Sequence, residues 1–318
     1  MKAFPDPSNS PAHHTRRLSI RSLPYVVAAA TAAHTWIRAF HNIITLVVDT
    51  VGWDDIRASL APLHAISPTL KSLWLSYNSI APSEVFDFIC SFPSLWDLAL
   101  MSIGEGETDI PALPPTSPRF TRTLSLARKG GARFNIQPLI ALPDGIHFTT
   151  IWVRCFAEDF ESATDLVSAC CDTLESFTML YFPSAFLLAC QLMSTSPPFV
   201  DPDTSSASVL LDLSRATNLK KIVFRFGRPS VLWVVMALQT VKSKNLQHIT
   251  IHQVTGSYRS LGVEEGLLPE WQDLDRLLVQ FWISHSIRPK LVDSMTHLRG
   301  LTPTLFPEST RRGLIDIV

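Results

Sequence analysis

The sequence predicts an α/β protein built from repeated strand–helix units with parallel strands. Three observations support this fold class. A short leucine motif recurs at a nearly constant interval, and the residues between its copies follow a helical period. The composition also suits a continuous core, since hydrophobic residues make up 46% of the 318 residues and charged residues 17%. Wholesale disorder is therefore excluded.

The clearest copy of the motif is the segment 70–80, LKSLWLSYNSI. It fits the pattern L-x-x-L-x-L-x-x-N-x-L, which is the signature of a leucine-rich repeat. Leu73 and Leu75 are two residues apart, so both side chains point to the same face of a strand. Asn78 is expected to bond backbone groups of the adjacent turn.

The spacing of the copies is the strongest evidence for repeats. The central anchors give successive intervals of 28, 27, 25, 26, 27, 26, 45 and 27 residues. Seven of these eight intervals fall within the range of about 20–29 residues typical of this repeat class. The long interval contains the proline- and serine-rich stretch 194–208, which we expect to be a loop insertion. The anchors are Leu18, Leu46, Leu73, Leu98, Leu124, Ile151, Phe177, Ile222 and Ile249.

Between the strands, apolar residues recur at helical spacing. Helices are expected near 54–66 and 184–193, and at three other places. At these places the apolar run follows Ser83, which suits an N-cap, or Ser162 or Thr164, or Ser230. Alternation of strand and helix predicts parallel strands with helical crossovers. The predicted fold is thus a leucine-rich-repeat solenoid, a curved horseshoe with strands on the concave face and helices on the convex face.

Three parts of the chain are predicted. Residues 1–14 form a disordered tail, and residues 15–256 form the solenoid with its insertion near 194–208. Residues 257–318 form a C-terminal cap and tail, which begins with an amphipathic helix over 269–281.

The charge balance and the motifs restrict the function. A formal net charge of -1 gives no electrostatic footprint for nucleic acid or an anionic membrane. No stretch is long and apolar enough to span a bilayer. Phosphate-binding, nucleophile-elbow and zinc-protease motifs are absent, so no catalytic, cofactor-binding or metal-ligating residues are predicted. The five cysteines form no C-x-x-C pair, which favours reduced thiols in the cytoplasm or nucleus.

The candidate binding residues alternate with the anchors along the strands, so we expect them on the concave face. Tryptophan and arginine dominate binding hot spots, which favours a non-catalytic scaffold for protein–protein recognition. Alternatively, the tryptophans pack on their neighbours and bind nothing, and the chain is a structural or remnant repeat protein. An unrecognised enzyme is the third alternative. The candidates are Trp74, Asp97, Met101, Trp152, Arg154, Lys221, Arg225, His248 and His252.

The repeats and the tail together resemble the leucine-rich-repeat portion of fungal-type F-box/LRR proteins. This resemblance implies recognition of substrates for a ubiquitin ligase, with a cullin-ligase adaptor as a further partner. Such proteins carry an F-box before the repeats, whereas only 14 residues precede the first copy here and show no F-box pattern. Contact with the adaptor is therefore left open. The tail motifs are Trp271-x-x-Leu274-Asp275-x-x-Leu278, then Ile287-Arg288-Pro289, then Leu305-Phe-Pro307-x-x-x-Arg311-Arg312-Gly313.

Overall fold

The chain forms two compact units, Met1–Phe148 and Thr149–Val318. We describe them one after the other from a computed structural model. The structure describes residues 11–21, 40, 42–49, 68–76, 82–101, 118–127, 136–155, 159–181, 210–226, 231–253, 268–293, 303–314 and 316–317.

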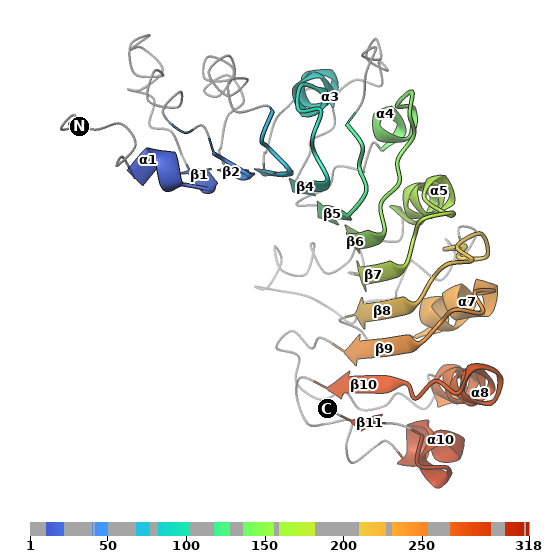
Figure 1. The fold of residues 1–318 in the computed structure, drawn as a ribbon. Coiled ribbons are helices and arrows are strands. Elements are labelled where there is room, and N and C mark those ends of the chain that lie inside the picture. Colours follow the sequence, from blue (N-terminus) through green and yellow to red (C-terminus); the bar gives the residue numbers. More distant parts are fainter. Residues whose placement is uncertain are drawn as a thin grey trace, which may run out of the picture. The chain divides into compact units, whose positions relative to one another are not determined.

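In the first unit the described strands form a parallel sheet in chain order (Figure 1). Helices α3 and α4 lie on one face of this sheet. The strands are β1 (Arg17–Arg21), β2 (Thr45–Asp49), β3 (Ser72–Ser76), β4 (Asp97–Met101) and β5 (Thr123–Ala127). The helices are α1 (Pro11–His14), α3 (Pro82–Cys90) and α4 (Gln137–Ile140).

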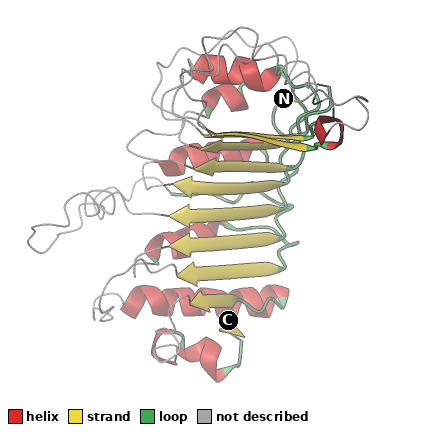
Figure 2. Cartoon of the chain, turned by 90° about the vertical axis from the view of Figure 1, so that its left-hand side faces the viewer, coloured by secondary structure: helices red, strands yellow, loops and turns green. Residues whose placement is uncertain are grey.

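The second unit repeats this arrangement. Its strands pair in parallel and in chain order, with helices on one face (Figures 1 and 2). In each unit we call the sheet face opposite the helices the open face. The strands are β6 (Thr150–Cys155), β7 (Ser176–Tyr181), β8 (Lys221–Phe226), β9 (His248–Gln253), β10 (Lys290–Asp293) and β11 (Asp316–Ile317). The helices are α5 (Phe160–Ala169), α7 (Leu232–Thr240), α8 (Leu268–His285) and α10 (Pro307–Arg311).

The register of the strands follows the predicted anchors. In the first unit the central anchors pair from Leu18 on β1 to Leu124 on β5, and in the second unit from Ile151 on β6 to Ile249 on β9. Leu73 and Leu75 are buried beneath the helices, whereas Trp74 between them is exposed. The predicted α/β class and the parallel strands with helices alongside are confirmed.

The starts of the helices differ from the prediction. α3 and α5 already contain Ser83, Ser162 and Thr164, which were expected to precede them, and α7 starts after Ser230. Neither α5 nor α7 has a hydrogen bond from a capping side chain. Burial of the apolar face therefore decides where these two helices begin, rather than cap chemistry. The helices expected near 54–66 and 184–193, the insertion 194–208 and Asn78 lie outside the described residues.

Two short strands occur within the predicted cap and tail. β10 pairs with β9, which places Leu291 opposite Ile251, and β11 pairs with β10. The expected amphipathic helix is present as α8, and Trp271, Leu274 and Phe281 on its expected apolar face are buried. The parallel sheet thus continues past the last copy of the motif that the sequence shows.

Asp275 joins two segments of the tail that are distant in sequence. Its carboxylate, 1% exposed, accepts the backbone N–H groups of Glu308 at 2.8 Å and Ser309 at 3.0 Å. These groups lie in the first turn of α10, where helical N–H groups have no partner within the helix. Nearby, the rings of Trp271 and Phe306 pack edge to face at 5.5 Å. The tryptophan motif and the L-F-P motif therefore form one packed structure.

The backbone conformation just after α10 explains why a glycine follows this helix. Gly313 has φ of 62°, and its N–H donates to the carbonyl of Thr310 at 3.1 Å. The N–H of Leu314 donates to the carbonyl of Ser309 at 2.9 Å, and the Leu314 side chain is buried. This pair of bonds is a Schellman motif, which needs a left-handed residue at the position of Gly313.

We expect Leu73→Asp to destabilise the first unit by at least about 3 kcal/mol, because a carboxylate would replace a leucine that is 1% exposed. Chemical denaturation of the full chain measures this loss. Trp74→Asp is the matched control on the open face and should cost less than about 1 kcal/mol. Equal costs at both positions would contradict the alternation of faces.

Asp275→Asn should destabilise the second unit by about 2 kcal/mol, since an amide offers one acceptor oxygen to two buried N–H groups. Asp273→Asn on the same helix alters only a surface ion pair with Arg276, so it should change stability by less than about 1 kcal/mol. Thermal melting of both variants compares them, and a wild-type melting curve for Asp275→Asn would refute the capping role.

Candidate functional site

The open face of the second unit carries three rows of side chains across β6–β9. The strand register puts these side chains side by side, one from each strand. Figure 2 looks onto the strands with the helices behind them. The first row is Thr150, Ser176, Lys221 and His248; the second is Trp152, Thr178, Val223 and Thr250; the third is Arg154, Leu180, Arg225 and His252.

Six of the predicted binding residues belong to these rows. Lys221 lies opposite His248 and Arg225 opposite His252, while Trp152 and Arg154 share β6. Three of them are exposed, namely Arg154, Lys221 and His248. The other three are half-buried, and all six are held on rigid strands rather than on loops.

Arg225 and His252 contact each other directly. The Arg225 Nε–H donates to His252 Nδ1 at 3.1 Å. An imidazole nitrogen that accepts a hydrogen bond carries no proton, so in this arrangement the His252 proton lies on Nε2. The guanidinium has four other N–H donors, and the bond to His252 restricts its orientation.

The first unit carries the other three predicted residues on β3 and β4. Trp74 is 41% exposed and lies in register between Val47 and Ala99. Val47 is only 8% exposed although it is on the open face. Met101, at the end of β4, is half-buried. Trp74 therefore combines a large exposed aromatic surface with small or aliphatic neighbours.

Asp97 has a structural contact that the sequence did not reveal. Its Oδ1 accepts the backbone N–H of Thr123, the first residue of the next strand, at 3.0 Å. This bond ties β4 to β5 at the edge where the strands begin. Asp97 thus helps to join successive repeats, whatever its remaining acceptor sites bind.

The same edge carries a repeated pattern of backbone bonds. At six of the central anchors, the carbonyl two residues before the anchor accepts two consecutive N–H groups of the next repeat. Lys71, for example, accepts from Trp96 at 2.8 Å and Asp97 at 3.0 Å. Glu175 accepts from Lys220 at 2.8 Å and Lys221 at 3.0 Å. The carbonyls of Arg16, Ile44, Thr149 and Lys220 do the same.

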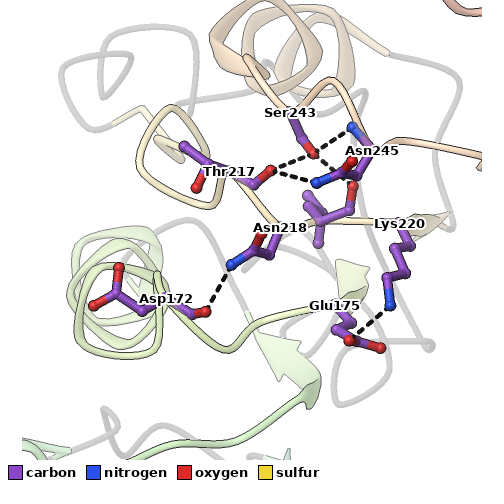
Figure 3. A network of polar contacts seen from close by, with 8 residues as sticks. Asp172, Glu175, Thr217, Asn218, Lys220, Ser243 and Asn245 are labelled. Carbon is purple, nitrogen blue, oxygen red and sulfur yellow. Dashed lines mark hydrogen bonds and ion pairs between the residues drawn. The ribbon is translucent and has the colours of Figure 1, made fainter.

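Asparagine side chains reinforce this edge four residues before three central anchors. Asn42 Nδ2 donates to the carbonyl of His13 at 2.7 Å, and Asn218 Nδ2 donates to that of Asp172 at 2.7 Å. Asn245 Nδ2 lies 3.5 Å from the Thr217 carbonyl (Figure 3). Each accepting carbonyl belongs to the preceding repeat. These three asparagines share the sequence pattern N-(L/I)-x-x-(L/I), which could have identified them. The sequence prediction named Asn78 instead.

Figure 3 also shows how the buried Ser243 joins this network. Its Oγ, in a residue that is 1% exposed, lies 2.8 Å from the carbonyl oxygens of both Thr217 and Leu219. It also accepts the N–H of Asn245 at 3.2 Å. Two repeats are thereby fixed to each other through one hydroxyl group.

In the first unit the corresponding edge carries a stack of side chains. The ammonium of Lys71 lies 4.2 Å from the Trp96 ring centroid, and the guanidinium of Arg122 lies 5.6 Å from it. These residues come from three successive repeats, each two positions before its anchor. Both distances are in the range of a cation–π interaction.

Cys90 is the cysteine whose surroundings bear most directly on its reactivity. Burial, with the negative charge of Asp87 as a second cause, raises the pKa of the Cys90 thiol to about 11. Cys155 and Cys170 are buried and Cys171 is half-buried, and none of these four described cysteines forms a disulfide. Since the thiolate is the reactive form, Cys90 is almost entirely unreactive at neutral pH.

No family model matches the chain, and no curated protein matches it either. Within the part of the chain that the structure describes, no three His, Cys, Asp or Glu side chains gather in a way that could hold a metal ion. None of the described helices is long and apolar enough to cross a membrane.

Asn218→Ala should destabilise the second unit by about 1 kcal/mol, because it removes a 2.7 Å bond to the preceding repeat. Asn245→Ala should cost less, since its contact of 3.5 Å is at the limit of a hydrogen bond. Urea denaturation of both variants gives the two values. If Asn245→Ala proves the more damaging, the asparagines do not act as inferred.

Proposed function

We propose that the chain is a leucine-rich-repeat solenoid that recognises protein partners through the open faces of its units and performs no catalysis. The observation that carries the proposal is the exposure of Trp74. A strand that buries both leucines around it holds this large aromatic side chain toward solvent. A rigid aromatic group presented in this way is typical of a binding hot spot.

The leucine-rich-repeat assignment is supported by repetition at several levels. Parallel strands follow one another in chain order with anchors in register. The backbone bonds at the starting edge of the strands recur from repeat to repeat. Such units cannot bury their own apolar faces and gain stability by stacking.

The resemblance to F-box/LRR proteins adds a partner class to the proposal. By that likeness, the open face would recognise a substrate for a ubiquitin ligase. A cullin-ligase adaptor would be a second partner only if another part of the molecule supplies the F-box function. The proposed compartment is the cytoplasm or nucleus, where cysteines that form no disulfide, such as Cys155 and Cys170, stay reduced.

The test is affinity capture from a native-type cell lysate, read by mass spectrometry. The wild-type chain is compared with the triple variant Trp74→Ala, Trp152→Ala and Arg154→Ala. We expect at least one protein to be captured by the wild type and lost with the variant, because truncating hot-spot residues typically costs more than about 2 kcal/mol of binding energy. Thermal melting of the variant checks that its fold is retained.

The captured proteins separate the alternatives. Enrichment of the cullin-ligase adaptor together with a variant-sensitive protein would indicate a working substrate receptor. A variant-sensitive protein without the adaptor would indicate a free-standing scaffold. Identical captures by a folded variant would contradict recognition through the open face.

A further inference from the structure

The open face of the second unit concentrates positive charge. Its three rows across β6–β9 contain three cationic side chains, Arg154, Lys221 and Arg225, and no aspartate or glutamate. The whole chain has 27 basic and 28 acidic residues. This face therefore departs from the nearly neutral balance of the molecule, and the departure needs an explanation.

Arg225 gives the sharpest indication. It is half-buried, and the described residues offer it a neutral imidazole nitrogen as hydrogen-bond partner rather than a carboxylate. A partly desolvated cation without an opposite charge costs free energy. The bond to His252 also orients the guanidinium, which reduces the entropy lost when an anion binds it.

The neighbours of Arg225 complete the arrangement. The third row reads Arg154, Leu180, Arg225 across three adjacent strands. Adjacent strands lie about 4.8 Å apart, so the backbones that carry the two arginines are separated by about 10 Å. The half-buried Leu180 fills the place between them, with Trp152 two residues from Arg154 on β6.

We propose that this row binds an extended acidic protein segment in which two carboxylates flank an apolar residue. The carboxylates bind Arg154 and Arg225, because a guanidinium pairs with a carboxylate through two parallel hydrogen bonds. The apolar residue packs on Leu180. The inference rests on the proposed function and deepens it by naming the chemistry of the partner.

Nucleic acid fits this face less well. Phosphate recognition usually requires a larger basic patch, with a domain pI above about 9, whereas the pI of this chain is about 6.8. An apolar leucine between the two cations also suits a peptide side chain better than a sugar–phosphate backbone.

The experiment is a selection from a displayed library of random twelve-residue peptides on the full chain. We expect selected peptides to carry two acidic residues, two to four positions apart, around an apolar residue. The synthetic consensus peptide should bind the double variant Arg154→Gln and Arg225→Gln at least about ten-fold more weakly. Its affinity should also fall as sodium chloride rises from about 50 to about 500 mM, because salt screens exposed charges.

Arg276→Gln is the matched control, since Arg276 is an exposed arginine on the helical side of the same unit. It should leave the affinity within about two-fold of wild type. Copies of the consensus with glutamine or with phosphoserine in place of the acids, and a twelve-nucleotide RNA, test the ligand class. Loss of binding with glutamine supports the proposal, and preferential binding of phosphoserine or RNA overturns it.

The remaining outcomes separate this inference from the proposed function. Selected peptides that are neutral or basic but depend on Trp152 would refute the acidic partner and leave recognition through the open face intact. Acidic peptides that bind the double variant as well as wild type would refute the role of the two arginines. Failure to select any peptide that depends on Trp152, Arg154 or Arg225 would count against both.

Discussion

The structure depends on the backbone bonds that join one repeat to the next where the strands begin. A carbonyl such as that of Lys71 or Glu175 accepts two consecutive N–H groups of the following repeat. This contact sets the register before the strand starts, so the anchors of neighbouring strands meet in the core. In a parallel sheet the strands are joined by long crossovers, and register is not set by a tight turn. The repeated carbonyl contact provides that constraint within each unit.

The fold class followed from the sequence because one short motif encodes both the strand and its buried face. Leu73 and Leu75 are buried and Trp74 is exposed, as the two-residue period requires. The helix starts were less predictable, because packing rather than a capping side chain sets them. β10 and β11 were missed for a different reason. They have four and two residues, and Leu291 of β10 follows its partner Ile251 by 40 residues, far outside the common interval.

The candidate site was predicted in part. Alternation along a strand identified which residues share the open face, and the register then placed Lys221 beside His248 and Arg225 beside His252. The sequence could not show that Asp97 bonds the backbone of Thr123, because that contact depends on the separation of two strands. It also drew attention to Asn78, although the asparagines with described bonds precede the strands. The complete leucine motif around Asn78 was given more weight than the shorter N-(L/I)-x-x-(L/I) pattern, although that pattern occurs three times.

The residues two positions before the anchors can differ in side chain without loss of the backbone bonds between repeats. Their backbone atoms make the bonds between repeats, while their side chains differ widely, with Lys71, Trp96, Thr149, Glu175 and Lys220 at equivalent places. The bonds between repeats need only a backbone N–H and a carbonyl. Proline lacks the N–H, so it is the one residue that cannot donate them. Mutations along this edge can therefore change charge or aromatic character with little loss of folding. The edge is a region where evolution can alter the surface rapidly while the architecture persists.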